Sequence, residues 1–197
     1  MSSADVSSLV LGTRNPHKVR EIERLLAPAG IAVEPLPEGI ELPPEEGVTF
    51  ADNALPKARA AADATGRPAI ADDSGIEADA LDGGPGVRSA RYAGHEATDE
   101  QNLEKLLREV PAGDRLRYVC ALSFVDPERG IERTFIGECA GRLAADPRGA
   151  RGFGYDPAFI PDEGPDARTM AELADSAKDE ISHRGRAVRE LLRWLRT

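Results

Sequence analysis

Residues 116–139 read LRYVCALSFVDPERGIERTFIGEC and contain two segments typical of β-strands, separated by a polar turn. The segments 116–125 and 131–139 have the composition and flanking turn residues of β-strands. The turn at 126–130 includes a proline and a glycine, two residues that favour chain reversal. We therefore expect a long β-hairpin in the middle of the chain.

Short apolar runs and helical segments flank this hairpin on both sides. Extended segments are expected at 8–11, 31–36, 69–71 and 76–81, and loops at 38–48 and 149–156. Helices are expected before Pro28, at 49–64, after Thr98, after Thr169 and over the last residues around 188–195. Strands and helices do not alternate strictly, which predicts an α/β (α+β mixed) fold with a mixed β-sheet. The length favours a single domain over residues 1–197, with residues 1–7 as a flexible tail.

The composition argues against several classes of protein. The 197 residues include 25 Lys and Arg against 35 Asp and Glu, a formal net charge of −10. This balance argues against a protein that binds duplex nucleic acid through a basic face, but it is compatible with a local cationic pocket for a small polyanion. The chain has no apolar run of ~18 residues for a membrane span and no signal-peptide pattern. The two cysteines are too few for a disulfide framework, and the three histidines are too scattered to predict a metal cluster. Together these features lead us to expect a cytoplasmic protein.

The first candidate site follows the first predicted strand and reads TRNPHK. It consists of Thr13, Arg14, Asn15, Pro16, His17 and Lys18. A turn from a strand into a helix directs backbone N–H groups outward at the positive end of the helix dipole, which favours phosphate binding. The segment is not a Walker A loop. For this stretch alone, the favoured interpretation is that Asn15 caps the helix and Pro16 occupies its first position.

The second candidate site is the segment DDSG at 72–75, directly after an apolar run. Successive side chains on a strand point to opposite faces, so we expect one of Asp72 and Asp73 to be structural and the other functional. A carboxylate at the carboxyl end of a strand can bind Mg²⁺ or take a proton from water. Glu45 and Glu46, in the preceding loop, offer further oxygen ligands. An ordinary acidic turn is the alternative.

A third candidate site is the glycine-rich segment GFGYDP at 152–157. Its glycines allow the backbone to approach a ligand closely, and the flanking aromatic residues Phe153 and Tyr155 could stack on a nucleobase. The glycine spacing does not match the dinucleotide-binding fingerprint, so a turn that closes a strand is the alternative.

A fourth candidate site combines Lys178 with the segment SHRG at 182–185, which precedes the last predicted helix. Lys178, His183 and Arg184 could contact a ligand, whereas solvated surface charge is the usual fate of such residues. Gly185 directly after Arg184 favours close backbone packing over a random surface run.

Taken in this order, these segments resemble the inosine triphosphate pyrophosphatase family, whose bacterial members hydrolyse dITP and XTP. The matching stretches are TRNPHK at 13–18, EEGVTFADNA at 45–54, AIADDSG at 69–75, PGVRSARYAG at 85–94, GFGYDP at 152–157 and SHRG at 182–185. They extend over nearly the whole chain, so the resemblance is specific. Arg88 departs from the family pattern, in which a neutral and often aromatic residue is expected.

The resemblance implies an enzyme that uses Mg²⁺ to cleave ITP, dITP or XTP between the α- and β-phosphates, which releases the monophosphate and pyrophosphate. Glu45 and Asp73 would be the metal carboxylates, and Asp73 would also be the base that activates water. Glu46 stays open as an alternative to Glu45, because the loop can be aligned with a one-residue slip. The implied substrate contacts are Thr13, Arg14, Asn15, Pro16, His17 and Lys18 for the triphosphate, then Ser74, Phe153, Gly154, Tyr155, Asp156, Lys178, His183 and Arg184.

The resemblance also implies a long mixed β-sheet flanked by helices in two lobes, with the active-site cleft between them, in a homodimer. Its partner would be a small-molecule nucleotide, without nucleic acid or membrane. Two other functions remain open from the residues. The first is a pyrophosphatase that acts on damaged pyrimidines or modified nucleotides, which a substrate panel would distinguish from an enzyme for ITP, dITP and XTP. A non-catalytic nucleotide sensor, in which the two aspartates only complete a turn, predicts binding without release of pyrophosphate.

Overall fold

The computed structural model describes residues 6–197, so most of the tail predicted at residues 1–7 lies outside the described residues. The two tail residues that are described are attached to the fold. The carbonyl oxygen of Ser7 accepts a hydrogen bond from the backbone N–H of Ala32 at 2.9 Å, and Val6 packs against the hydrophobic core.

Strands and α-helices make up most of the described chain. The strands are β1 (Ser8–Leu11), β2 (Ala32–Pro35), β3 (Ala69–Ala78), β4 (Arg115–Asp126), β5 (Ile131–Leu143) and β6 (Phe159–Pro161). The α-helices are α1 (Pro16–Leu26), α2 (Phe50–Thr65), α3 (Asp99–Glu109), α4 (Asp175–Ile181) and α5 (His183–Leu195). Short 3₁₀ helices connect them: η1 (Ala27–Ala29), η2 (Asp79–Leu81), η3 (Gly86–Arg91), η4 (Asp156–Ala158), η5 (Pro165–Ala167) and η6 (Met170–Glu172).

The strands form one mixed sheet in the order β2-β1-β3-β4-β5-β6. β1 pairs in parallel with both β2 and β3, while β5 pairs antiparallel with β6. β4 and β5 are joined by a turn at 127–130, where the hairpin was predicted. The predicted α/β (α+β mixed) class with a mixed sheet flanked by helices is therefore confirmed.

β3 differs from the prediction. The segments 69–71 and 76–81 were expected to be separate, with DDSG between them, but one continuous strand extends from Ala69 to Ala78. Asp72 and Asp73 therefore lie in the middle of a strand, neither at its end nor in a turn. The strand can continue because the charge of Asp72 is compensated inside the fold, as described below.

Two further elements differ near the C-terminus. The helix predicted after Thr169 is a single 3₁₀ turn, η6, and the unpredicted helix α4 follows it. His183 and Arg184 do not precede the last helix but form the first turn of α5.

The described chain divides into two compact units. Unit 1 consists of the chain up to Asp73, Cys120–Gly137 and Arg184–Thr197. Unit 2 consists of Ser74–Val119 and Glu138–His183. The chain passes from one unit to the other within β3, β4, β5 and α5.

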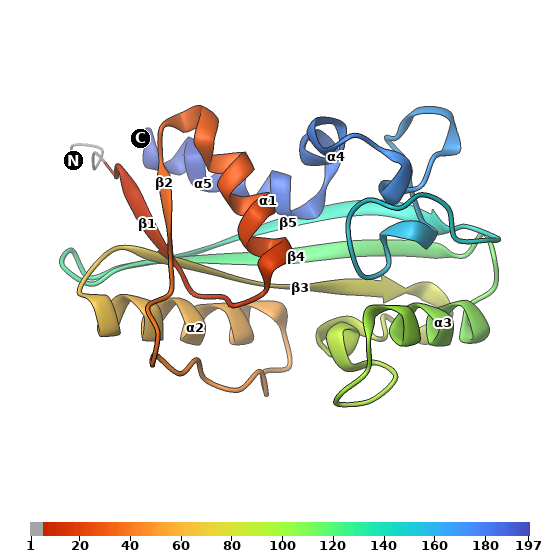
Figure 1. Cartoon of the computed structure of the whole chain (residues 1–197), viewed down its shortest axis with the longest axis horizontal. Helices are drawn as coiled ribbons and strands as arrows, with labels where there is room; N and C mark the ends of the chain where they lie inside the picture. The colour runs from red at the N-terminus through yellow and green to blue at the C-terminus, as the bar shows by residue number, and fades with distance from the viewer. Residues whose placement is uncertain (1–5) are drawn as a thin grey trace. The chain divides into compact units, whose positions relative to one another are not determined.

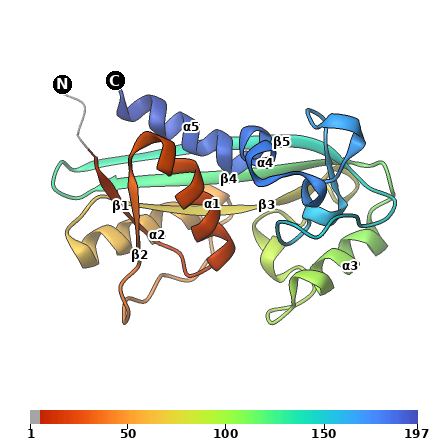
Figure 2. The ribbon, with the colours of Figure 1, turned by 45° about the horizontal axis from the view of Figure 1, so that its top comes forward.

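In unit 1, helices cover both faces of the strands: α1 and α5 lie on one face, and α2 lies on the other (Figures 1 and 2). The alternation of side chains on β1 produces this division, because Leu9 and Leu11 pack toward α1 and α5 while Val10 packs toward α2. The face of α2 that meets the strands is rich in alanine, with Ala58 and Ala61 fully buried. Small side chains allow this helix to approach the strands closely.

In unit 2, α3 lies on one side of the strands and α4 on the other (Figure 2). α3 begins at the predicted capping box of Thr98 with Gln101 and contributes Leu103 and Leu106 to the core. The long loop after β5 contributes Tyr155 to the same core.

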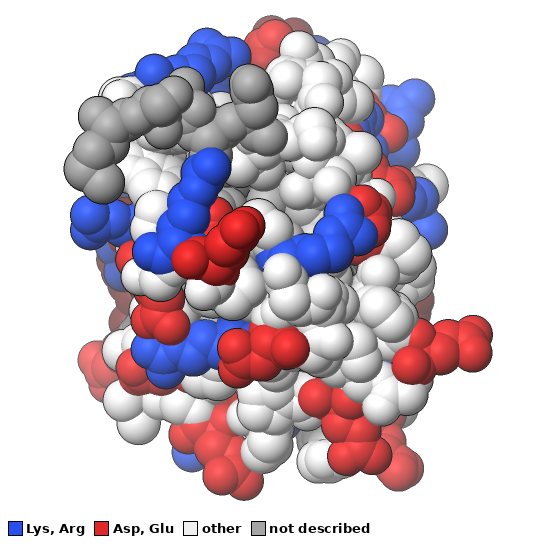
Figure 3. Space-filling model, turned by 90° about the vertical axis from the view of Figure 1, so that its left-hand side faces the viewer, with Lys and Arg blue, Asp and Glu red and all other residues white. Residues whose placement is uncertain are grey.

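Charged side chains of both signs are interspersed on the face shown in Figure 3, so positive charge does not form a continuous basic surface among the atoms coloured there. Ion pairs in unit 1 join Arg59 to Glu132 at 2.6 Å and Arg67 to Glu34. In the described part of the chain, the helices are all too short or too polar to cross a membrane.

Candidate active site

Asp72 lies in the middle of β3 with no exposed surface. Its Oδ2 accepts hydrogen bonds from Nε and Nη2 of Arg184 at 3.1 and 2.9 Å, and it lies 3.2 Å from Nζ of Lys18. Nη1 of Arg184 donates to Oε2 of Glu21 at 2.5 Å. Burial alone would raise the pKa of Asp72, but the nearby positive charges, first that of Lys18, outweigh it and hold this pKa below its usual range. Asp72 is therefore an anchor for α1 and α5 that is ionised near neutral pH.

Asp73 follows Asp72 on the strand and meets a different helix. Oδ2 of Asp73 accepts a hydrogen bond from Nδ2 of Asn53 on α2 at 2.8 Å. Burial and, next, the negative charge of Glu45 raise the pKa of Asp73 above its ordinary value. A carboxylate with a raised pKa takes up a proton more readily, which is the property that a general base requires.

The loop that carries Glu45 is attached to α2. Nζ of Lys57 contacts Oε1 of Glu45 and donates a hydrogen bond to the backbone oxygen of Asp72 at 2.8 Å. Oδ1 of Asn53 accepts a hydrogen bond from the backbone N–H of Gly47 at 2.7 Å. A Cβ at Gly47 would also lie 2.7 Å from this oxygen, which is too close for a side chain, so the contact favours glycine at this position. One helix face thus positions both the acidic loop and the aspartate on β3.

The surroundings of Glu45 and Glu46 differ. Glu45 is partly buried and its charge acts on Asp73, whereas the side chain of Glu46 is exposed. The geometry therefore favours Glu45 as the carboxylate that acts together with Asp73.

The turn TRNPHK connects β1 to α1, where it was predicted. Oδ1 of Asn15 accepts hydrogen bonds from the backbone N–H groups of His17 and Lys18 at 2.9 and 3.3 Å, and Pro16 is the first residue of α1. The backbone N–H of Asn15 donates to Oγ1 of Thr13 at 3.2 Å. These N–H groups are already occupied, so a phosphate at this turn would be bound mainly by side chains.

Two cationic side chains of this turn have different surroundings. Nη2 of Arg14 donates to the backbone oxygens of Pro37 and Ile40 at 3.2 and 2.9 Å, which attaches the turn to the loop after β2. Lys18 lies next to Asp72, on the opposite face of β3 from Asn53.

A second cluster, in unit 2, is centred on Asp156, which is buried. Its Oδ2 accepts hydrogen bonds from Nζ of Lys178 at 2.6 Å and from the backbone N–H of Phe153 at 2.9 Å. Its Oδ1 accepts a hydrogen bond from the hydroxyl of Tyr118 at 3.2 Å. Gly152 has a φ of 72°, and a Cβ there would collide with Oδ2 of Asp156, so the turn requires glycine at this position.

Aromatic rings and cationic groups meet around this carboxylate. The ring of His183 stacks on that of Tyr118, with centroids 4.5 Å apart and planes inclined by 9°. Nζ of Lys178 lies 5.4 Å from the ring centroid of Phe153, which is partly exposed. His183 and Lys178 are each only 5% exposed, so the alternative of solvated surface charge is wrong for them. Such a combination suits a planar heterocycle that accepts hydrogen bonds.

The remaining residues of the glycine-rich segment have structural contacts. The hydroxyl of Tyr155 donates to the backbone oxygen of Ser89 at 2.7 Å, and the backbone N–H of Gly154 donates to Oδ2 of Asp99 at 2.9 Å. Tyr155 lies in the core of unit 2, so of the two aromatic residues only Phe153 is placed to stack on a base. Ser74 follows Asp73 on β3 and is partly exposed.

Each unit therefore brings together part of the predicted site. In unit 1 these residues are Lys18, Glu45, Asp73 and Arg184, and in unit 2 they are Phe153, Asp156, Lys178 and His183. Arg184 was expected around the nucleoside, but its guanidinium binds Asp72 and Glu21. A substrate contact by Arg184 stays a prediction, and in this structure the residue positions Asp72.

Asn53, Lys57 and Tyr118 had no predicted role in the site. Asn53 and Lys57 are four residues apart and lie on the same face of α2 as the buried alanines. Polar residues within an apolar helical stripe are a signal that could have identified both. Tyr118 has no such signal, because an aromatic residue in an apolar strand is ordinary core.

A divalent metal ion fits the carboxylates of unit 1. Among residues 6–197, no group of three His, Cys, Asp or Glu side chains could hold a metal ion by itself. Mg²⁺ in nucleotide enzymes is usually held by one or two carboxylates together with substrate phosphates. Glu45 and Asp73 supply two carboxylates of this kind; burial and, next, the charge of Glu45 raise the pKa of Asp73, and a cation would relieve the repulsion between the two carboxylates.

The chain is similar to known proteins over nearly its whole length. The model of the Ham1 family matches residues 9–194. A protein from Cutibacterium acnes named dITP/XTP pyrophosphatase is 49% identical over 195 residues, which cover 95% of each chain. A protein of the same name from Yersinia pseudotuberculosis is 47% identical over 198 residues, which cover 97% of this chain and 99% of the relative. The solved structure of a HAM1 protein from Coxiella burnetii has a TM-score of 0.84 at 38% identity and covers 95% of this chain and 98% of that chain.

The resemblance to nucleoside triphosphate pyrophosphatases inferred from the motifs is thereby confirmed. Since the family model and these relatives extend over nearly the whole sequence, this chain belongs to the Ham1 family.

Proposed function

We propose that this protein hydrolyses the non-standard purine nucleoside triphosphates dITP, XTP and ITP to the monophosphate and pyrophosphate, and thereby removes them from the nucleotide pool. The observation that carries the proposal is the acidic pair Glu45 and Asp73. The two carboxylates lie close enough for the charge of Glu45 to raise the pKa of Asp73, in a chain nearly half identical to dITP/XTP pyrophosphatases.

In the proposed reaction, Asp73 takes a proton from the water molecule that attacks the α-phosphorus. The bond between the α-phosphorus and the oxygen that bridges to the β-phosphorus breaks, and pyrophosphate leaves. Asn53 positions Asp73 by donating to its Oδ2, so that the other carboxylate oxygen is oriented for the proton transfer. Asp72 cannot replace Asp73, because its ion pairs keep it charged and enclosed.

The proposal includes Mg²⁺. Glu45 and Asp73 would hold it together with phosphate oxygens, where it neutralises part of the phosphate charge and favours deprotonation of water. Lys57 contacts Glu45 and keeps the acidic loop next to β3. Lys18 supplies positive charge for the triphosphate, together with the other side chains of the TRNPHK turn.

The base would be recognised by the cluster around Asp156. Phe153 offers a partly exposed ring for stacking, and Lys178 and His183 offer N–H donors. The 6-oxo group of hypoxanthine or xanthine accepts a hydrogen bond, whereas the 6-amino group of adenine donates one. Donors directed at this edge would therefore disfavour ATP, because they would remain unpaired in the complex.

The family resemblance also carries the proposals of a homodimer and a cytoplasmic location. Sedimentation equilibrium of the purified full-length chain tests the first, since a dimer has twice the mass calculated from the sequence.

The decisive experiment is a pyrophosphate-release assay over ITP, dITP, XTP, ATP and GTP, with and without Mg²⁺. We expect rapid release from the first three substrates in the presence of Mg²⁺ and little release from ATP. Tight binding of ITP without any release of pyrophosphate would instead identify a nucleotide sensor.

A further inference from the structure

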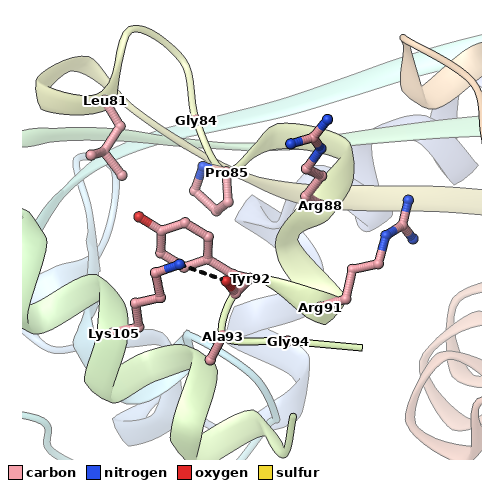
Figure 4. Close-up of a pocket in the computed structure, with 9 residues that line it drawn as sticks. All are labelled: Leu81, Gly84, Pro85, Arg88, Arg91, Tyr92, Ala93, Gly94 and Lys105. Carbon is pink, nitrogen blue, oxygen red and sulfur yellow. Dashed lines mark hydrogen bonds between the residues drawn. The ribbon is translucent and has the colours of Figure 1, made fainter. Parts of the chain in front are cut away.

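Unit 2 contains a pocket of about 760 Å³ that is separate from the residues assigned above (Figure 4). Its walls come from the turn before η3, from η3 itself and the residues after it, and from α3. Cationic residues are concentrated in this lining, which includes Arg88, Arg91 and Lys105 and has no acidic residue. In a chain of net charge −10, such a lining produces a local positive potential.

One end of the pocket is formed by a pair of arginines. Arg88 and Arg91 are three residues apart on η3, and this spacing places side chains on the same side of a 3₁₀ helix. Figure 4 shows both guanidinium groups on one side of η3. The exposed side chain of Arg88 has no hydrogen bond or ion pair with any described residue. Arginine side chains placed in this way can bind phosphate oxygens with two parallel hydrogen bonds each.

The other end of the pocket is apolar and aromatic. Leu81, the ring of Pro85 and the ring of Tyr92 lie together there (Figure 4). Nζ of Lys105 donates to the backbone oxygen of Tyr92 at 2.8 Å and lies 4.2 Å from the centroid of the Tyr92 ring. Lys105 therefore supports Tyr92 and places a third positive charge at the apolar end of the pocket, beside the Tyr92 ring (Figure 4).

We propose that this pocket is a second binding site, which takes a nucleotide-sized ligand with its phosphate at Arg88 and Arg91 and its planar group against Pro85 and Tyr92. The volume is within the range of ~300–1,000 Å³ that is typical of small-molecule sites. The lining contains no Asp or Glu that could act as a general base or metal ligand, so we assign the site to binding and not to catalysis. The inference does not depend on the hydrolysis proposed above, because none of these residues belongs to either cluster of the candidate active site.

The test is equilibrium binding of AMP, a nucleoside monophosphate that contains no phosphoanhydride bond to be cleaved, to the full-length protein and to matched variants. Arg88→Glu reverses the charge at the pocket. Arg142→Glu makes the same change at an exposed arginine of β5, in the same unit but outside the pocket. We expect Arg88→Glu to weaken AMP binding about tenfold or more, because it removes a charge-assisted hydrogen bond and adds repulsion. Arg142→Glu should leave the affinity unchanged.

Three further measurements distinguish the outcomes. Adenosine and inorganic phosphate separate the two ends of the pocket, and each should bind more weakly than AMP. Lys18→Ala, which alters the candidate active site, should leave the Arg88-dependent binding in place, and Arg88→Glu should hydrolyse ITP at the wild-type rate.

Equal AMP affinity in the two charge-reversal variants overturns the proposal, and so does AMP binding that is lost in Lys18→Ala alone. A change of oligomeric mass in Arg88→Glu without AMP binding to the wild type would assign the pocket to a protein contact and equally overturn it. Arg88→Gln serves as the variant if the charge reversal impairs folding.

Discussion

Asp72 and Asp73 are neighbours on β3, yet their carboxylates point to opposite faces of the sheet and have opposite shifts in pKa. Asp72 is enclosed by positive charge, which keeps it ionised. Asp73 is buried beside a negative charge, which favours its protonated form. One short segment thus carries two carboxylates in opposite electrostatic surroundings, and the alternation of side chains along a strand keeps them apart.

Asp73→Asn should abolish most of the turnover and leave the fold intact. An amide cannot take a proton from water, and loss of a general base typically costs ~10²–10⁴-fold in rate. Because Asn53 donates to Oδ2 of Asp73, the amide of the variant can still accept that hydrogen bond. The measurement is kcat for ITP together with the melting temperature, and turnover that stays near wild type would assign the base elsewhere.

Asp72→Asn should act on stability instead. The change leaves the buried guanidinium of Arg184 with an incomplete ion pair, and breaking such a pair costs about 3–5 kcal/mol of the free energy of unfolding. Denaturant unfolding at pH 7 measures this cost. If Asp72→Asn were stable but inactive, and Asp73→Asn active, the roles of the two aspartates would be reversed.

The lowered pKa of Asp72 also predicts how the stability difference between wild type and Asp72→Asn depends on pH. The folded-state pKa of Asp72 lies below its ordinary value of 3.8, so the stabilisation from its ionised form is complete above that value. It declines as the pH falls below 3.8 and is lost once the pH passes the folded-state pKa. The difference in free energy of unfolding between wild type and Asp72→Asn should therefore be constant near neutrality and shrink in acid. A difference that grows on acidification would contradict the assignment.

Removal of metal should stop the reaction, and the two loop glutamates should differ in their effect on it. We expect full loss of pyrophosphate release in excess EDTA and recovery with Mg²⁺. Glu45→Gln should raise the Mg²⁺ concentration required for half-maximal rate at least about tenfold, because it removes one of two carboxylate ligands. Glu46→Gln, at the exposed neighbouring position, is the matched control and should require the wild-type concentration. The opposite result would place Glu46 at the metal.

Lys18→Ala should reduce kcat/KM for ITP and XTP by similar factors. The Lys18 ammonium group is a point charge next to Asp72, and in the proposed function it would act on phosphate without contacting the base. The assay compares both substrates in the same variant. A large loss for one substrate with none for the other would move Lys18 to the base site.

His183→Ala should narrow the preference for ITP over ATP. If His183 donates to the 6-oxo group, its removal lowers kcat/KM for ITP by about tenfold or more and leaves ATP nearly unchanged. Phe153→Ala is the comparison, because a stacking ring does not distinguish the two bases and both substrates should lose equally. Equal losses in His183→Ala would mean that the histidine supports the fold through its stacking on Tyr118.

Local features of the fold could be predicted because they depend on residues close together in the chain. The caps at Asn15, Thr49 and Thr98 each satisfy backbone N–H groups two or three residues away, so their patterns are visible in the sequence. The hairpin of β4 and β5 is likewise determined by two segments of strand-like composition and the turn between them. The candidate residues of the site were also recognised from their motifs, but their partners were not.

What the sequence alone determined is therefore most of the helices and strands, the hairpin and the identity of the motifs, since these follow from neighbouring residues. Only the tertiary structure decided that DDSG continues β3, because the charge of Asp72 is balanced by Arg184, 112 positions away in the chain. It likewise decided that the two aspartates have different surroundings, since Asn53, 20 positions before Asp73, binds one carboxylate oxygen of Asp73 while burial raises the pKa of that residue. A pKa depends on desolvation and on charges within a few ångströms, and these are properties of packing that no local pattern contains.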